Sequence, residues 1–415
     1  MTSTQPRPIG IVPEDPALRL LALGTLVNRA GTGAIMTTLV LYFTRVEALS
    51  PTRVGLALSI GAVVAMLVQV PLGHLGDVRG PRGILSALQV LTGIFTAGLL
   101  FTDSIVVLIP VISLVLGAQS GASAVRNGYI ARIAPGPTGV HFRAYLRAVT
   151  NLAIGFGTLL GGLALWIDEP WAYLVVFGLD ATFSVLTGLI SMRLPHLEPA
   201  PARAAGEPMF GVLRDPPYVV VTLLTGIVAI HFQVIAVGIP LWISIHTQAP
   251  THMVAVLLLV NTVVVTLFQV RASRGADTVP HSATATARGS AWLAAAFCVW
   301  ALSSGVDATR SIVLLLIGAC VHVVGEMMTS GGQWGTTMGL APQERQGQYQ
   351  GFAGLGFGLA NVIGPGLIAW LCVDHGSTGW LVLAALVLVA GLLTPPACAW
   401  ALRTRGAYGA ATASG

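Results

Sequence analysis

Apolar segments of membrane-spanning length follow one another along almost the whole chain, and they restrict its possible folds more than any other feature. Each is long enough to cross the roughly 30 Å of bilayer hydrocarbon as a helix. Composition agrees, because 54% of the residues are hydrophobic and only 9% are charged, against about 25% charged in soluble domains. No segment alternates like a barrel strand, so the spans are predicted to be helical.

Twelve helices are expected, at residues 18–44, 54–73, 84–102, 105–130, 142–166, 171–192, 218–244, 253–270, 290–305, 311–337, 349–371 and 379–401. The proline-rich residues 1–17 lack the apolar core of a signal peptide and are expected to form a leader. The segment 194–217 reads as a linker, and the tail 402–415 is rich in small residues.

A short pattern recurs at half the chain length. The chain reads LVQVPLGHLGD at 67–77 and LFQVRASRGAD at 267–277. Internal repeats between membrane-length segments are common in secondary transporters. We therefore expect two pseudo-symmetric six-helix bundles, at residues 18–193 and 218–401, in an all-α membrane protein.

The basic residues predict the topology. All 21 are arginines; 16 fall in loops on one side of the predicted membrane and three on the other, while Arg29 and Arg126 lie inside helices. The positive-inside rule then places both termini, the linker and residues 73–83 in the cytoplasm. The net charge of +5 is a topology signal, because no basic patch with interleaved aromatic residues suggests nucleic-acid binding.

The polar segment 73–83, GHLGDVRGPRG, separates the second and third expected helices. Gly73 and Gly80 would permit close helix approach and a tight turn. Asp77, at a helix end, could accept hydrogen bonds from a neighbouring helix N-terminus or pair with an arginine. Such contacts would latch the cytoplasmic ends of the two bundles; the alternative is that the turn only fixes topology.

This segment resembles the signature loop of the Major Facilitator Superfamily, G-x-L-a-D-r-x-G-r-k-x-x-l. The matching residues are Gly73, Leu75, Asp77, Gly80, Arg82 and Leu85, whereas Val78 and Pro81 stand at usually basic positions. The resemblance implies two six-helix domains that work by alternating access. The helices at 18–44, 105–130, 218–244 and 311–337 would line a central cavity between them.

A second pattern is similar to the antiporter motif of that superfamily, g-x-x-x-G-P-x-x-G-G. In the helix at 142–166, Gly157, Gly161 and Gly162 match, with alanine at the first position and threonine in place of proline. Gly364 and Pro365 repeat part of the pattern in the helix at 349–371. Such residues let helices pack closely, here between the fifth and eighth or the second and eleventh helices; ordinary helix packing is the alternative.

Ionisable residues inside the membrane are the strongest site candidates, because each is costly unless paired or hydrated. His322 and Glu326 stand four residues apart in the helix at 311–337, on one face with Gln333 and beside Trp334. We expect Glu326 to carry a proton, with His322 tuning it, and Gln333 and Trp334 to line the cavity. A fixed structural hydrogen bond between Glu326 and His322 is the alternative.

Other buried polar residues extend the candidate site. Asp180 is a second candidate for proton coupling, with packing or capping as the alternative. Arg29 lies near the midplane of the first helix and needs a partner or water, so it is expected to face the cavity or to form an internal pair. The remaining expected cavity residues are Asn28, Arg126, His231 and Gln233.

The sequence excludes several function classes. It contains no G-x-x-x-x-G-K-[ST] phosphate loop, no H-E-x-x-H and no metal-ligand cluster. We therefore expect no ATP-driven transport and no enzymatic activity, and we expect neither a cofactor nor a metal. The energy would come from a gradient, and the protonatable residues favour protons.

Residues 126–162 and 325–365 look like stretches of actinobacterial superfamily members described broadly as efflux proteins. The resemblance implies a monomeric, proton-coupled exporter of a small drug- or antibiotic-like molecule in a bacterial cytoplasmic membrane. Its partners would be the substrate, protons and the lipid bilayer. An importer of a sugar, peptide or organic acid, and a membrane sensor that does not transport, remain open alternatives.

Overall fold

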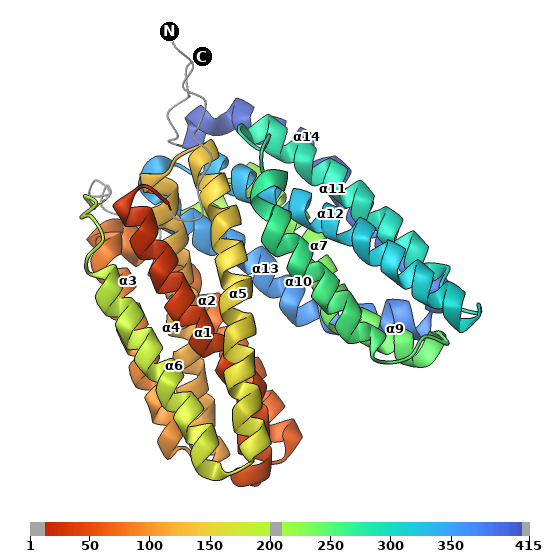
Figure 1. The fold of residues 1–415 in the computed structure, drawn as a ribbon. Helices are drawn as coiled ribbons and strands as arrows, with labels where there is room; N and C mark the ends of the chain where they lie inside the picture. Colours follow the sequence, from red (N-terminus) through yellow and green to blue (C-terminus); the bar gives the residue numbers. More distant parts are fainter. Residues whose placement is uncertain (1–12, 200–209, 409–415) are drawn as a thin grey trace. The chain divides into compact units, whose positions relative to one another are not determined.

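The structure is a computed structural model that describes residues 13–199 and 210–408 (Figure 1). The first half contains α1 (Pro16–Leu41), continued by the π-helical η1 (Tyr42–Val46), α2 (Pro51–Arg79), α3 (Pro81–Gly98) with η2 (Leu99–Phe101), α4 (Ile105–Ile133), α5 (Pro137–Ile167) and α6 (Pro170–Ser191). Over the described residues the chain forms helices and turns and no strand.

The second half begins with the short η3 (Gly211–Arg214) and an interrupted helix made of α7 (Pro216–Ala229), α8 (His231–Gln233), η4 (Val234–Gly238) and α9 (Ile239–His246). It continues with α10 (Met253–Ala272), α11 (Val279–Ala301), α12 (Ala308–Leu340), η5 (Gln343–Arg345), α13 (Gln346–Ile368) with η6 (Ala369–Asp374), α14 (Gly376–Thr404) and η7 (Arg405–Tyr408). The expected all-α fold with twelve long helical segments is confirmed for the described part of the chain.

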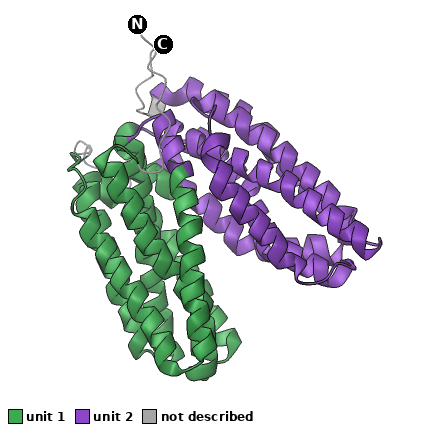
Figure 2. Ribbon diagram, in the orientation of Figure 1, with its two compact units in different colours: residues 1–133, 145–211, 343–352 green, residues 134–144, 212–342, 353–415 purple. Residues whose placement is uncertain are grey.

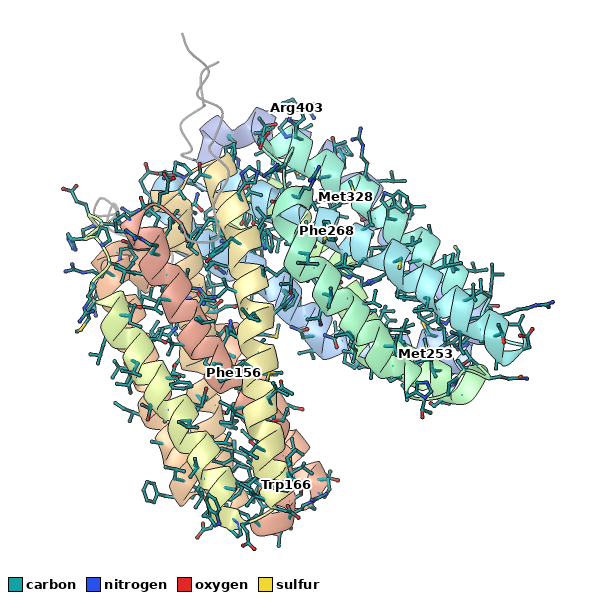
Figure 3. All side chains as sticks on the ribbon, viewed as in Figure 1. Phe156, Trp166, Met253, Phe268, Met328 and Arg403 are labelled. Carbon is teal, nitrogen blue, oxygen red and sulfur yellow. The ribbon has the colours of Figure 1, made fainter. Side chains whose placement is uncertain are left out.

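Ten of these helical segments are long and apolar enough to cross a membrane, by length and composition. Among the described helices, α1 and α11 are long but do not belong to this group. Large apolar side chains are exposed along the segments, including Phe156 and Trp166 on α5 (Figure 3). This exposure suits a protein whose solvent is lipid hydrocarbon.

The chain forms two compact units (Figure 2). Unit 1 comprises residues 1–133, 145–211 and 343–352, and unit 2 comprises 134–144, 212–342 and 353–415. The main passage between units falls after Gly211, within the expected linker 194–217. Two segments are exchanged: the start of α5 belongs to unit 2, and η5 with the start of α13 belongs to unit 1. Residues 1–12 of the leader, the middle of the linker and the end of the tail lie outside the described residues.

The repeated pattern occupies matching places in the two units. Gln69 on α2 is buried and accepts a hydrogen bond from Ser120 of α4, with 2.9 Å between the oxygens. Gln269 on α10 is buried and donates to the Met327 carbonyl of α12 over 3.2 Å. Each glutamine therefore joins the second and fourth long helical segments of its own half, as a pseudo-symmetric fold requires.

Local sequence encodes many helix starts. The Asp15 carboxylate accepts hydrogen bonds from the amides of Ala17 and Leu18, at 2.7 and 3.2 Å, and Pro16 follows at the first helical position. Thr278 caps α11 through the amide of His281. Such caps satisfy amides that the helix leaves without partners.

The expected start of the ninth helix, at 290, was wrong, because α11 begins eleven residues earlier at Val279. Its first turns are polar, and their hydroxyls are satisfied by backbone carbonyls, as in the bond from Thr286 to Ser282. Small residues also let α11 touch α12: a Cβ added to Gly332 would lie 2.8 Å from the Thr286 nitrogen. Close packing of small polar residues stabilises this part of the helix, which a criterion based on apolarity misses.

The seventh helix was expected to be continuous over 218–244, but it is interrupted after Ala229. The π-helical η4 directly precedes Pro240, which stands in the first turn of α9. Proline has no N–H to donate, so a widened turn accommodates the missing hydrogen bond. The interruption places His231 and Gln233 on the short helix α8, between the turn at Ile230 and the π-helical η4.

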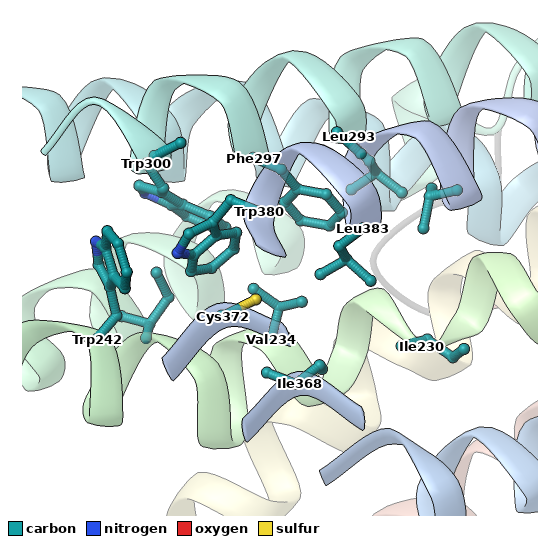
Figure 4. Close-up of a cluster of buried hydrophobic side chains, with 14 of the residues drawn as sticks. Ile230, Val234, Trp242, Leu293, Phe297, Trp300, Ile368, Cys372, Trp380 and Leu383 are labelled. Atoms are coloured by element: carbon teal, nitrogen blue, oxygen red, sulfur yellow. The ribbon is translucent and has the colours of Figure 1, made fainter. Parts of the chain in front are cut away.

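A buried aromatic cluster forms part of the unit 2 core (Figure 4). Trp242, Trp300 and Trp380 are fully buried, with ring centroids 5.6 Å apart in the pairs Trp242–Trp380 and Trp300–Trp380. Trp300 donates from its indole nitrogen to the Leu315 carbonyl over 3.2 Å, so its polar atom is satisfied. Trp300 also contacts His322, with 5.3 Å between centroids, and thus connects the core to the candidate site.

Candidate functional site

Four polar residues meet inside unit 2, and we call them the unit 2 cluster: His231 of α8, Asn261 of α10, and His322 and Glu326 of α12. The Asn261 amide donates to Glu326 Oε2 over 2.6 Å, and His322 Nδ1 lies 3.7 Å from the same oxygen. The His231 and His322 rings are 5.2 Å apart between centroids. Both histidines are 0% exposed and Glu326 is 4% exposed.

Local structure explains this meeting. His322 and Glu326 are one turn apart on α12, so both side chains reach the same face. His231 follows directly after the interruption at Ile230. Phe297 and Trp300 of α11 lie beside His322, at centroid distances of 6.2 and 5.3 Å. In such apolar surroundings a carboxylate is costly unless its partners compensate for lost water.

The chemistry of the cluster is suited to one mobile proton. A carboxyl group and two imidazoles can each bind or release a proton, while the Asn261 amide can donate to the ionised carboxylate. One ring nitrogen from each of His231 and His322 and one carboxylate oxygen of Glu326 lie within 4.8 Å of one another. Tetrahedral zinc ligands, at about 2.0–2.2 Å from the metal, stand only about 3.3 Å apart, so metal binding would require these side chains to draw together.

Sequence reasoning found the pair His322 and Glu326 but not the full cluster. His231 was expected near the cavity on its own, and Asn261 was not among the expected site residues. Both are distant in sequence from α12, and only the packing of α8 and α10 on α12 brings them to Glu326. An amide in an apolar helix such as α10 was the available signal, because such residues usually hydrogen-bond a neighbouring helix.

A second group of buried polar residues lies in unit 1. Asn28 of α1 donates to Gln89 of α3 and Ser184 of α6, at 3.4 and 3.5 Å. Asp180 of α6 is 1% exposed. Its charge interacts electrostatically with that of Arg29 on α1, although no ion pair within 4 Å joins them among the described residues.

Close helix packing brings Arg29 and Asp180 together. A Cβ added to Gly31 would lie 2.9 Å from the Asp180 Cα, so α1 and α6 touch at this level. Neither carboxylate oxygen of Asp180 has a hydrogen-bond partner among the described groups. Asp180 therefore offers the internal counter-charge considered for Arg29, and a cavity-facing role for Arg29 stays a prediction.

The other expected cavity residues are distributed within their own units. Gln233 donates to the Asn361 side chain over 2.6 Å. Gln333 donates to the Thr225 carbonyl over 3.0 Å and so joins α12 to α7, and its neighbour Trp334 is half-buried. Arg126 is half-buried near the end of α4. Substrate contacts by these residues stay predictions.

Asp77 makes the contact that the signature segment suggested. Its carboxylate accepts hydrogen bonds from the backbone amides of Gly347 and Gln348, each over 2.9 Å, within unit 1. These amides belong to the first turn of α13, so a carboxylate from α2 caps another helix. Asp77 is 3% exposed. The expected contact with a helix N-terminus is therefore observed.

The signature segment is not the turn expected over 73–83. The helix α2 continues to Arg79, and the turn consists of Gly80 alone, with φ of 93°, before α3 begins at Pro81. Gly73 lies inside α2, where a Cβ would stand 2.8 Å from the Gly347 carbonyl carbon. Its role is close helix approach, whereas Gly80 supplies the left-handed turn. Arg82 donates to the Leu194 carbonyl over 3.3 Å.

The antiporter-like glycines pack within bundles, whereas contacts between the fifth and eighth or second and eleventh helices were expected. A Cβ on Gly157 would lie 2.9 Å from the Ala34 nitrogen of α1, and one on Gly161 would lie 2.7 Å from the Ala34 carbonyl oxygen. Gly162 faces open space. In unit 2, Gly364 of α13, which precedes Pro365, packs on Gln233. The motif therefore allows α5 to pack closely on α1, and its copy in α13 packs on Gln233 of the seventh helix.

Two units of long apolar helices, built on a repeated pattern and holding buried charges, define a multi-pass α-helical membrane transporter fold. The profile of the Major Facilitator Superfamily matches residues 21–365, and the chain belongs to this family. Its members are transporters. The sequence has no significant match among curated proteins.

Solved structures share this fold at low identity. The human organic anion transporter MFSD10 is 15% identical, with a TM-score of 0.66 over 92% of this chain and 100% of that chain. A bacterial homologue of the iron transporter ferroportin is 15% identical, with a TM-score of 0.70 over 93% and 99%. The proton:xylose symporter XylE is 17% identical, with a TM-score of 0.61 over 91% and 94%.

Proposed function

We propose that this protein is a proton-coupled exporter of a small drug- or antibiotic-like molecule and works by alternating access. The observation that carries the proposal is the burial of Glu326 in α12 beside an amide donor and two imidazoles. A carboxyl group in this position can hold a proton in dry surroundings and release it when water arrives. In the family fold, alternating exposure would couple that release to substrate movement.

In the proposed cycle, Glu326 binds a proton from the outer side and releases it to the cytoplasm. When Glu326 is ionised, the Asn261 amide stabilises the carboxylate, and His322 tunes the exchange. Substrate would leave the cell in the opposite direction. Asp180, beside Arg29, is the second candidate for the coupling group.

The exchange direction and the substrate class rest on sequence resemblance. The pattern around Gly157 is similar to that of antiporters, and residues 126–162 and 325–365 resemble efflux proteins. Multidrug efflux with antibiotic resistance is the corresponding biological role. The setting would be a bacterial cytoplasmic membrane, with a monomeric protein and both termini in the cytoplasm.

The contact between Asp77 and the start of α13 would serve as the conformational latch. It accepts hydrogen bonds from two amides in the first turn of α13, and breaking it would loosen that helix end. Arg29, Arg126, His231, Gln233, Gln333, Trp334 and Asn28 are the proposed substrate-cavity residues.

Transport by purified protein in proteoliposomes, with an imposed pH gradient, tests the proposal. A panel of cationic, anionic and neutral compounds is loaded, and both substrate flux and internal pH are followed. Export should acidify the compartment that corresponds to the cytoplasm, and a protonophore should abolish uphill movement. Substrate and proton moving together would favour the importer of a sugar, peptide or organic acid. Absence of flux for every compound, with folding intact, would favour a sensor.

A further inference from the structure

A pocket of about 330 Å³ opens in unit 2, where the end of α10, the start of α11 and the middle of α12 meet. Its lining combines basic, hydroxyl and small residues, among them Arg274, His281, Thr284, Arg288, Met328 and Gly331. It is separate from the unit 2 cluster, because its lining includes no residue of that cluster. The mechanism proposed above does not use it.

The charge of this pocket is one-sided. Arg274, His281 and Arg288 are exposed, and the lining contains no carboxylate. Among the described residues, neither arginine forms an ion pair within 4 Å. The acidic residue next in the chain, Asp277, follows in the loop between α10 and α11 but does not line the pocket. Two guanidinium groups therefore face a cavity that has no counter-charge of its own.

The position of Arg288 adds to the argument. It is the tenth residue of α11, so it stands about 14 Å along the helix from Val279. Arg288 is exposed at the pocket, so its guanidinium can meet an anionic partner there. The pocket gives its guanidinium an opening at the end of unit 2 where Arg271 and Arg274 also lie. This is the end that the arginine distribution assigns to the cytoplasm.

We infer that this pocket binds a phosphate group, and that the phosphate is the headgroup of an anionic phospholipid of the cytoplasmic leaflet. The planar guanidinium presents paired donors that match phosphate oxygens. The N-terminus of α11 adds partial positive charge at the His281 end of the pocket. Basic pockets between membrane helices on the cytoplasmic side are suited to such headgroups. The pocket, of about 330 Å³, is larger than a lone phosphate needs.

Native mass spectrometry of the full-length protein in neutral detergent tests the inference. Phosphatidylglycerol and phosphatidylcholine are titrated separately against the wild type, the double variant Arg274→Gln/Arg288→Gln and the control Arg214→Gln/Arg403→Gln. The control removes two exposed arginines that lie outside the pocket. Thermal melting and gel filtration check that each variant is folded.

Phosphatidylglycerol should bind the wild type more tightly than phosphatidylcholine does. Loss of both pocket arginines should weaken phosphatidylglycerol binding about 25-fold, at roughly fivefold for each arginine, and the control should bind like the wild type. Inorganic phosphate, added as a competitor, should displace the lipid only at high concentration.

Three results would overturn the inference. Equal phosphatidylglycerol affinity in the wild type and the pocket variant would show that the pocket does not bind the headgroup, and an equal loss in the control would reduce the effect to surface charge. If inorganic phosphate alone bound with the same arginine dependence while phosphatidylglycerol did not, the lipid assignment would be wrong and a soluble phosphate compound would be the ligand.

Discussion

At the scale of single residues, the molecule places a carboxyl group where water is scarce and surrounds it with groups of different proton affinity. Asn261 donates to Glu326, two imidazoles stand beside it, and aromatic rings close the far side of His322. A carboxylate without the amide would lose a charge-assisted hydrogen bond, worth about 1.5–3 kcal/mol. Protonation of Glu326 therefore weakens its hydrogen bond with Asn261 and changes its interactions with both histidines.

Replacing Glu326 with Gln should abolish substrate accumulation driven by a pH gradient while retaining substrate binding and downhill exchange. The amide has nearly the shape of the carboxyl group and can still accept from Asn261, but it cannot carry a proton. Gradient-driven flux and exchange in proteoliposomes measure the two properties. His322→Ala is the companion variant, and it should shift the pH profile rather than eliminate transport. Uphill accumulation by Glu326→Gln would transfer the coupling role to Asp180.

Arg29 and Asp180 allow a test that separates charge balance from substrate contact. Because the two charges interact inside unit 1, Asp180→Asn should lower stability by about 1–3 kcal/mol by leaving a buried charge less compensated. Adding Arg29→Ala should recover much of that loss, as measured by thermal melting. If Arg29 also orients substrate, the double variant should remain defective in transport even after its stability is restored.

Replacing Arg29 with Lys should not rescue transport, because lysine lacks the bidentate fork of the guanidinium. Normal transport by Arg29→Ala would contradict the proposal that Arg29 orients the substrate.

At the scale of helices, the capping of α13 by Asp77 is the most specific contact. The two copies of the repeat differ here, because Asp77 is buried against α13 whereas Asp277 is exposed. Sequence could identify Asp77 as a helix-end residue able to cap a neighbouring helix, but not which helix it caps. The choice depends on where the first turn of α13 lies, and that is a property of tertiary packing.

Asp77→Asn should reduce transport and favour the inward-open state while sparing expression. An amide has one acceptor oxygen, so one of the two α13 amides would face an N–H donor and lose about 1 kcal/mol or more. Transport and the accessibility of a cysteine introduced on the cytoplasmic side report the two effects. The matched control is Asp277→Asn, which should behave like the wild type. Unchanged transport in the Asp77 variant would leave the segment a topological role only.

Helix prediction succeeded and failed for physical reasons that particular elements illustrate. Long apolar runs such as α14 were predicted because lipid requires both length and apolarity. The start of α11 was missed because serine, threonine and glycine there stabilise the helix by packing on α12. The π-helical η4 was missed because Pro240 lies inside a continuous apolar run.

At the scale of the whole chain, the repeat predicted two related bundles, and matching glutamines bear out this relation. Leu67 and Leu267, which begin the repeated pattern, are 66% and 67% exposed, while the glutamines two residues later are buried. Pattern alone could not reveal that the first turns of α5 and α13 are exchanged between units, since that exchange depends on tertiary contacts. Nor could it group His231 with Glu326.

The arginine distribution makes a topology prediction that covers both halves at once. In a cysteine-free background, which requires replacement of Cys298, Cys320, Cys372 and Cys398, single cysteines would be introduced at positions of known helix ends. Arg79→Cys and Arg271→Cys, at the ends of α2 and α10, should react with a membrane-impermeant thiol reagent only after the cells are opened. Arg53→Cys and Arg310→Cys, near the starts of α2 and α12, should react in intact cells. Because the two halves are pseudo-symmetric, Arg79→Cys and Arg271→Cys should be labelled from one side of the membrane, and Arg53→Cys and Arg310→Cys from the other. Labelling of Arg79→Cys from inside together with Arg271→Cys from outside would contradict the repeat, whereas inversion of all four would preserve the fold and reverse the assignment of the cytoplasmic face.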